Sequence, residues 1–267
     1  MNHFFRLLVG ATMVAMCALP AHAASFKQAK KHYAAADYSA AIAELQPLAK
    51  AGNADANNLL GEMYLQGVGV NSDITLAKTF FEAGARVGHL AALANLADIL
   101  NREYKVELVT LEPLAEAGNA KAQNRLGRMY EFGQGHSINP QAAYAWYKKA
   151  ADQGLMNGRM NLARAHNFGL GTEQDFVKAE AGYLANAKAG HVDSMFFLGT
   201  MHFAQVSQAG LDSDRQAYAW LKVAAQNGHA TAAAMVTRLA IKLGDNLSQG
   251  DALYQDYATR YTSAAAN

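Results

Sequence analysis

Small and apolar side chains recur along residues 120–154 at the three- and four-residue spacing of a helix that packs on one side. Ala122, Leu126 and Tyr130 fall on one stripe of this pattern, which predicts a first helix. The sequence Gly-Gln-Gly at 133–135 follows, and glycine adopts without strain the positive φ that a tight turn requires. The first half of this stretch is therefore expected to be a helix that ends in a glycine turn.

A second helix is predicted between Asn139 and Gly154. The Asn139 side chain can cap this helix, and Pro140 suits the first helical position because a missing N–H costs nothing there. Gly154 permits a left-handed end. Two helices of this length cannot bury their apolar faces on each other alone, so the unit needs neighbours.

The neighbours are repeats of the same unit. Helix-ending glycines recur at intervals of 36, 30, 36, 36 and 38 residues, and they are Gly52, Gly88, Gly118, Gly154, Gly190 and Gly228. The fourth residue after each glycine is always small, and the eighth is always aliphatic. Because the segments between these glycines follow the helical period, we predict about eleven to fourteen helices and almost no strand.

The residues Leu126-Gly127, Tyr130 and the Gly-x-Gly of 133–135, followed by Ala-Tyr-x-Trp-Tyr-x-Lys-Ala-Ala, resemble the Sel1-like repeat family, a relative of the tetratricopeptide repeats. The resemblance covers about residues 53–228. It implies an all-α fold, a right-handed α-solenoid of antiparallel helix pairs. It also implies a scaffold that holds protein partners and usually has no chemistry of its own.

The repeat divides the chain into parts. Residues 24–52 are expected to form an N-terminal capping helix pair, and residues 229–267 are expected to form C-terminal capping helices. Between them, residues 53–228 divide into five repeats, 53–88, 89–118, 119–154, 155–190 and 191–228. The segment 89–118 lacks the glycine turn, but we still expect a helix pair there.

Residues 1–23 match a secretory signal peptide. Arg6 precedes the apolar run 7–19, and Ala-His-Ala at 21–23 has the small-x-small pattern of a cleavage site. Cleavage is therefore expected between Ala23 and Ala24, which predicts a periplasmic or secreted protein. The apolar run is short for a membrane span, so no transmembrane segment is expected in the mature chain.

The composition narrows the possible chemistry. A lipoprotein reading would make Cys17 the modified residue, but the bulky Met16 disfavours it. Removing the signal peptide also removes Cys17, the one cysteine of the chain, and leaves no disulfide or thiol chemistry. The 23 basic and 22 acidic residues become 22 of each once Arg6 is gone, so no net field favours nucleic acid.

No motif for catalysis or for a cofactor stands out. The Gly-x-Gly pairs at 67–69, 133–135 and 169–171 follow helices rather than strands and continue into no phosphate-binding sequence. The histidines of the mature chain lack metal-binding spacing, and no serine hydrolase motif occurs. We therefore predict no enzyme, no cofactor and no metal. A capping role accounts for the three histidines that follow helix-ending glycines, His89, His191 and His229.

A partner is expected on the first helices, on the face opposite the buried stripe, which lines the concave side in solenoids of this kind. The candidate residues are the sixth and tenth after the helix-ending glycines, Asn58, Glu62, Asp98, Asn124, Arg128, Arg164, Phe196 and Thr200. The tenth position is acidic in early units and basic in later ones, so a partner should present the opposite order. One of Phe196 and Phe197 is expected to be exposed and to anchor the partner.

These features favour an exported, non-enzymatic scaffold that binds a protein or peptide on its concave face. A binder of cell-wall glycans, or a regulator of an enzyme that acts on them, is the alternative, because aromatic and amide side chains can contact sugars. A hydrolase is the second alternative.

Overall fold

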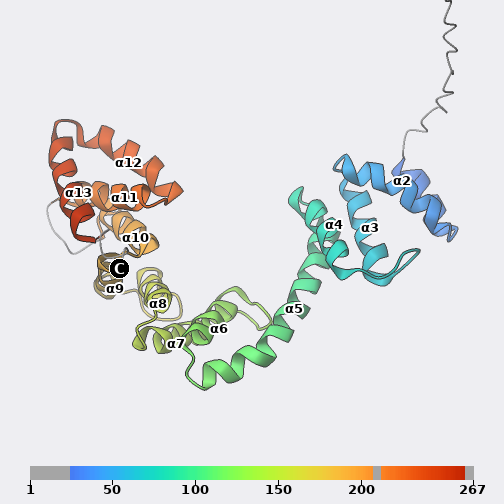
Figure 1. The fold of residues 1–267 in the computed structure, drawn as a ribbon, viewed down its shortest axis with the longest axis horizontal. Coiled ribbons are helices and arrows are strands. Elements are labelled where there is room, and N and C mark those ends of the chain that lie inside the picture. The colour runs from blue at the N-terminus through green and yellow to red at the C-terminus, as the bar shows by residue number, and fades with distance from the viewer. Residues whose placement is uncertain (1–24, 207–211, 262–267) are drawn as a thin grey trace, which may run out of the picture. The chain divides into compact units, whose positions relative to one another are not determined.

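The computed structural model describes residues 25–206 and 212–261, and within these ranges the chain folds into thirteen α-helices and one short 3₁₀-helix, without any strand (Figure 1). The predicted all-α class is confirmed, and the number of helices lies in the predicted range. The predicted signal peptide at 1–23 lies outside the described residues, as does the end of the chain from residue 262. The elements in order are α1 (Phe26–Ala34), α2 (Tyr38–Lys50), α3 (Ala54–Gln66), α4 (Ile74–Arg86), α5 (Leu90–Glu116), α6 (Ala120–Phe132), α7 (Pro140–Asp152), α8 (Met156–Phe168), α9 (Phe176–Lys188), α10 (Val192–Phe203), α11 (Ser213–Gln226), α12 (Ala230–Leu243), η1 (Gly244–Asn246) and α13 (Leu247–Tyr261).

The chain forms two compact units, and the division falls inside α5, between Ile99 and Leu100. The first unit contains α1 to α4 and the beginning of α5. The second unit contains the rest of α5 and α6 to α13. Each unit has its own buried cores, so each is described by itself.

The local signals that end and start the helices act as predicted. Gly133 ends α6 with φ 68°, in the left-handed region, and Gly154 follows α7 with φ 85°. All six helix-ending glycines that define the repeat have positive φ. The second helix begins in four pairs at a side chain that accepts a backbone N–H three residues later, and these residues are Asp37, Asp73, Asn139 and Asp175.

The segment 89–118 differs from the prediction. It forms one helix, α5, of 27 residues, so the expected helix pair is wrong. The segment lacks the glycine turn that lets the chain reverse in other units, and the backbone therefore continues in the helical conformation. Pro113 lies inside this helix and does not end it.

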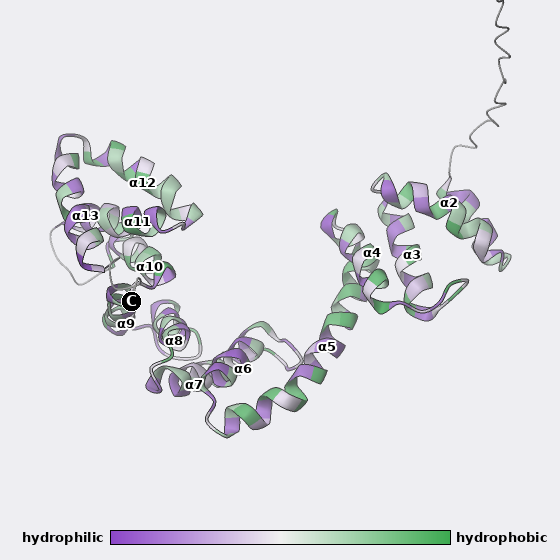
Figure 2. Ribbon diagram, viewed as in Figure 1, coloured by the Kyte–Doolittle hydropathy of each residue, from purple (hydrophilic) through white to green (hydrophobic). Residues whose placement is uncertain are grey.

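The two helices of a pair approach closely at glycine. A Cβ atom added at Gly61 would lie 2.5 Å from the Phe81 ring, and one at Gly127 would lie 2.6 Å from the Tyr147 ring. Phe81 and Tyr147 are almost completely buried. Hydrophilic and hydrophobic residues are mixed along most helices, as expected when each helix buries only one side (Figure 2). Glycine at these positions thus lets the paired helices pack closely.

Candidate partner-binding surface

A row of capping histidines fixes where first helices begin. In each of them Nδ1 accepts the backbone N–H three residues later, which confirms the predicted capping role. The acceptor nitrogen must be unprotonated, so the ring proton lies on Nε2. The pairs are His89 with Ala92, His191 with Ser194 and His229 with Ala232, at 3.1, 3.2 and 3.2 Å.

The same histidines also contact the preceding first helix. His89 Nε2 lies 3.2 Å from Asp55 Oδ1, and His191 Nε2 lies 3.1 Å from Asn157 Oδ1. One imidazole therefore caps its own helix and sets its register against the helix before it. This arrangement fixes the spacing of the first helices on which a partner is expected.

The candidates of the first unit contact one another. Asn95 Nδ2 donates to Asn58 Oδ1 at 3.1 Å and to Glu62 Oε1 at 3.3 Å, and Asn58 Nδ2 donates to Glu62 Oε1 at 2.8 Å. Asn58 and Glu62 are half-buried, and they hold α3 to α5. Asp98, further along α5, is exposed.

The second unit repeats the amide contact. Asn161 Nδ2 donates to Asn124 Oδ1 at 2.8 Å, which joins α8 to α6. Both amide pairs are separated by 37 residues, so they are equivalent contacts of the repeat. Asn58 and Asn124 therefore connect neighbouring first helices, and their side chains are only partly available to a partner.

Arg164 belongs to a half-buried polar cluster. Its Nη2 lies 2.5 Å from Glu131 Oε2, and the Tyr147 hydroxyl donates to the same oxygen at 2.6 Å. The Arg164 and Glu131 side chains are 20% and 12% exposed. Burial, and then the hydrogen bond to Glu131, raise the pKa of Tyr147, so it stays a neutral donor. The expectation that Arg164 offers a free positive charge to a partner is wrong, because Glu131 neutralises it.

A cavity of about 190 Å³ lies beside this cluster, among α6, α7 and α8. Its wall is mostly apolar, and the Glu131 carboxylate that could offer it a charge is already paired. The lining residues are Glu131, Phe132, Pro140, Ala143, Tyr147, Asn161, Arg164, Ala165 and Leu170.

Two other predicted site residues differ in availability. Arg128 is exposed on α6, as a residue that meets a partner should be. Thr200 is half-buried, and its hydroxyl donates to the Phe197 carbonyl of its own helix at 2.7 Å. Arg128 is therefore the basic candidate in the second unit that remains accessible.

The two phenylalanines of α10 are both partly buried, so the expectation that one is exposed is wrong. Phe196 stacks on the His229 ring at 4.1 Å, and Phe197 stacks on Tyr183 at 5.3 Å. The next helix supplies the cover that the sequence did not reveal, because His229 is the cap of α12. Whether Phe196 still contributes to an interface remains a prediction.

Sequence reasoning missed the partners of these residues. The amides of Asn95 and Asn161 could have been found, because each follows another asparagine of the row by 37 residues. Glu131 and Tyr147 carry no comparable signal, since their pairing with Arg164 depends on side-chain reach across two helices.

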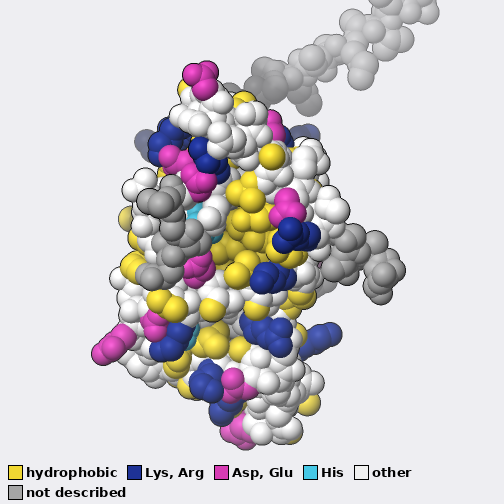
Figure 3. Space-filling view, turned by 90° about the vertical axis from the view of Figure 1, so that its left-hand side faces the viewer, with side chains coloured by type: hydrophobic (Ala, Val, Ile, Leu, Met, Phe, Trp, Pro, Cys, Tyr) yellow, Lys and Arg dark blue, Asp and Glu magenta, His cyan; other side chains and the backbone are white. Residues whose placement is uncertain are grey.

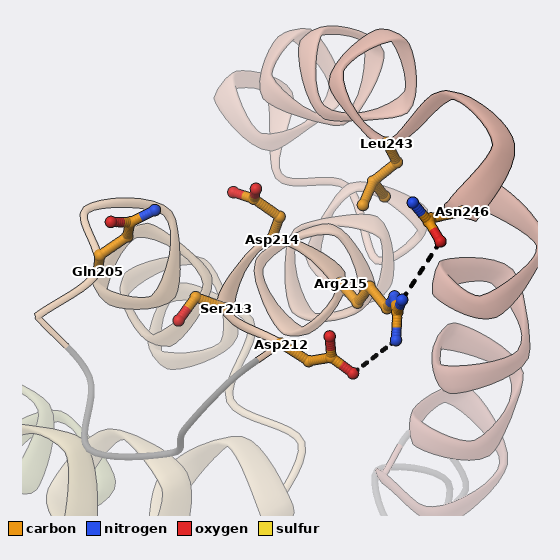
Figure 4. Close-up of a pocket in the computed structure, with 7 residues that line it drawn as sticks. All are labelled: Gln205, Asp212, Ser213, Asp214, Arg215, Leu243 and Asn246. Carbon is orange, nitrogen blue, oxygen red and sulfur yellow. Dashed lines mark hydrogen bonds and ion pairs between the residues drawn. The ribbon is translucent and has the colours of Figure 1, made fainter.

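Figure 3 looks from the side on which α12 and α13 lie, and it shows hydrophobic side chains gathered in the middle of this face with Lys and Arg side chains beside them. A separate polar pocket of about 380 Å³ lies where α11 begins (Figure 4). In it Arg215 donates to Asp212 at 2.6 Å and to Asn246 at 3.3 Å.

Within residues 25–206 and 212–261, no group of three or more His, Asp or Glu side chains is arranged to hold a metal ion. In the same ranges, no helix combines the length and the apolar character that a membrane crossing needs.

Comparison with a protein family gives four matched segments. The model of the Sel1 repeat matches residues 54–89, 120–155, 158–181 and 192–229. Three of these segments contain the pairs α3 to α4, α6 to α7 and α10 to α11, and the segment 158–181 contains most of α8 and the first part of α9. The intervening α5 segment is not matched, in agreement with its single helix.

Individual proteins show the same likeness. Protein sel-1 homolog 2 of Rattus norvegicus is 29% identical over 139 residues, which cover 48% of this chain and 20% of that protein. The ERAD-associated E3 ubiquitin-protein ligase component HRD3A of Arabidopsis thaliana is 27% identical over 141 residues, covering 53% of this chain and 17% of that protein. The chain thus spans about a fifth of the length of these relatives. The crystal structure of a Sel1 repeat protein from Oxalobacter formigenes aligns with 87% of this chain and 95% of its own, with a TM-score of 0.48 and 25% identity.

Proposed function

This chain belongs to the Sel1 repeat family, whose members generally mediate protein–protein interaction, and we propose that it is an exported, non-enzymatic scaffold that binds a protein or peptide in the cell envelope. Export rests on the pattern of residues 1–23, where Arg6 and an apolar run precede Ala-His-Ala.

The observation that carries the binding proposal is the contrast between two positions of the repeat. The fourth residue after each helix-ending glycine is small and buried in every unit, Ala56, Ala92, Ala122, Gly158, Ser194 and Ala232. The tenth residue instead changes in charge, and Asp98 and Arg128 at that position are exposed. The buried position thus keeps the packing of the units constant, while the surface position offers a different side chain in each unit. Such variation allows an extended partner to be recognised along the repeat.

The geometry also supports a sharper choice of binding residues. Arg128 is exposed, whereas Arg164 is neutralised by Glu131. A partner that approaches the second unit therefore meets the Arg128 charge first. Charge at such a position mainly affects the rate of association and its dependence on salt.

The test is a pulldown from the envelope fraction with residues 24–267 as bait, alongside the Arg128→Glu variant. We expect a specific partner whose association with the variant is slower and less sensitive to salt. Recovery of no specific partner would contradict the binding proposal. Retention of the bait on purified wall material, with no protein partner, would favour the glycan alternative instead.

Export is tested separately. Fractionation of cells that express the full chain should place it in the periplasm or the medium, and sequencing of its amino terminus should begin at Ala24. A cytoplasmic protein that retains residues 1–23 would contradict export and leave the binding proposal in place.

A further inference from the structure

Three helix pairs share a sequence pattern of glycine on the first helix and an aromatic residue at a fixed position on the second, and a fourth reverses it. In three pairs the first helix carries a glycine nine residues after the helix-ending glycine that precedes the pair. The second helix carries an aromatic residue eight residues before the helix-ending glycine that follows the pair. These residues are Gly61 with Phe80, Gly127 with Trp146 and Gly199 with Trp220. In the α8–α9 pair the corresponding residues are Ala163 and Gly182. The glycine has moved to the second helix, and position 182 carries no aromatic ring, although the next residue, Tyr183, is buried like Tyr147 of the α6–α7 pair.

The reversal keeps the helices close together. A Cβ atom added at Gly182 would lie 2.9 Å from the Ala163 Cβ, so the methyl group of Ala163 occupies the place where the side chain at 182 would begin. The tight approach of α8 and α9 therefore explains why residue 182 is glycine. The Ala163 methyl group does not fill the space that the Trp146 ring occupies in the α6–α7 pair.

That space is an open hollow in the α8–α9 pair. In the α6–α7 pair the Trp146 ring packs in a cluster with Leu126 and Tyr130. The residues that correspond to Leu126 and Tyr130 are Leu162 and His166, and they border a hollow of about 280 Å³ with a mostly apolar wall. The hollow is lined by Arg159, Leu162, Ala163, His166, Lys178, Ala181, Gly182 and Ala185.

We propose that this hollow receives an aromatic side chain of a protein partner, and that acidic residues flank this side chain in the partner. The inference rests on the proposed function, because it assigns a contact point to a protein-binding scaffold. The size of the occupant follows from the chain itself, since the Trp146 ring fills the equivalent place in the α6–α7 pair and the Phe80 ring, stacked on Tyr64, fills it in the α3–α4 pair.

The charge of the occupant follows from the rim. Arg159 is exposed at the edge of the hollow, and Lys178 lies at the same edge. Lys178 is paired with Asp175 at 2.8 Å, so Arg159 is the cation that the hollow offers to a partner. Burial, and then the charge of Lys178, lower the pKa of His166, so its ring, which forms part of the wall, is neutral at pH 7.

A short peptide tests the inference directly. The probe is acetyl-Gly-Asp-Trp-Asp-Gly-amide, titrated into ¹⁵N-labelled residues 24–267 and followed by the movement of backbone amide signals. We expect the largest movements at the residues that line the hollow. Replacing the tryptophan of the peptide by alanine should abolish them, and replacing both aspartates by lysine should weaken binding about tenfold.

Two variants locate the site. The double variant Ala163→Gly with Gly182→Trp restores the pairing of the other three units and places a ring in the hollow. Ala181→Leu obstructs the edge of the hollow without touching the close contact, because Ala181 is exposed. Both should weaken peptide binding about tenfold or more. The matched control is Ala145→Leu, the same exposed position on α7, which should bind like the parent.

The outcomes are separable. Equal movements with the alanine peptide, movements centred on other residues, or unchanged binding by both variants would overturn the inference. A natural partner that binds the double variant as tightly as the parent would likewise overturn it, while leaving the scaffold proposal intact. Circular dichroism of both variants confirms that lost binding is not lost fold.

Discussion

The substitution Gly127→Leu tests the packing on which the whole repeat depends. A Cβ atom at this position would lie 2.6 Å from Cε1 of the Tyr147 ring and 3.2 Å from the Ala143 carbonyl oxygen. Tyr147 is 2% exposed, and its hydroxyl is held by Glu131 at 2.6 Å. The ring therefore cannot move aside without breaking a buried hydrogen bond.

Two opposing effects determine whether Gly127→Leu raises or lowers the free energy of unfolding. Replacing a helical glycine gains about 0.5–1 kcal/mol of helix propensity. Overpacking a buried contact costs about 1–3 kcal/mol and sometimes more, and leucine adds three further carbon atoms beyond the clashing Cβ. We expect a net loss of about 1–2 kcal/mol in the free energy of unfolding. For a chain of this size that corresponds to a melting temperature lower by about 2–8 °C.

The assay is thermal and urea unfolding followed by circular dichroism. Because repeat proteins can lose one unit without unfolding completely, hydrogen exchange of the α6 and α7 amides should be measured as well. The matched control is Ala97→Leu, which has the same repeat position on α5 and is exposed, so its stability should change by less than about 0.5 kcal/mol. An unchanged melting temperature and unchanged exchange for Gly127→Leu would show that the close contact does not constrain these helices.

Two further predictions follow from charge. Arg164→Met leaves the half-buried Glu131 carboxylate without a cation and should lower the free energy of unfolding in urea by about 1–3 kcal/mol. The control Arg128→Met should change it by less than about 0.5 kcal/mol, because Arg128 is exposed. Equal effects of the two variants would contradict the pairing of Arg164 with Glu131. Burial lowers the pKa of His166, His191 and His202 below the usual 6.5, so the unfolded chain binds protons first as the pH falls. Stability should therefore be constant above about pH 7 and decrease below about pH 6.5, before carboxylates titrate, and a urea midpoint that stays flat from pH 7.5 to 5.5 would refute this.

Much of the secondary structure could be predicted because its signals are local. A glycine in the left-handed region ends a helix wherever it stands, and an asparagine or aspartate side chain can cap the next helix from within three residues. The helix predicted between Asn139 and Gly154 is α7, Pro140–Asp152, for this reason. The spacing of the glycines then indicated the repeat without any tertiary information.

The candidate site could be predicted only in part. The helical period correctly placed Asn58 and Asn124 on one face, but it could not show that each amide is used by the next first helix. A similar limit applies to Phe196, because its exposure depends on a ring that lies 33 residues further along the chain. Sequence position determines the direction of a side chain, whereas its availability depends on the neighbouring unit.

The length of α5 shows how a small change in the repeat alters the way the array packs. The interval from Gly88 to Gly118 is 30 residues, six shorter than the common interval of 36. The missing residues correspond to the glycine turn, and the two 13-residue helices of an ordinary pair, such as α6 and α7, are replaced by one helix of 27 residues, about 40 Å long. A helix cannot reverse without a turn, so its second half cannot fold back on its first. The first half instead packs on α4 through Ala92 and Ile99, and the second half packs on α6 through Leu108 and Ala115. Each half thus contributes to the core of a different unit, and the division between the two units falls inside α5, the helix that lacks the turn.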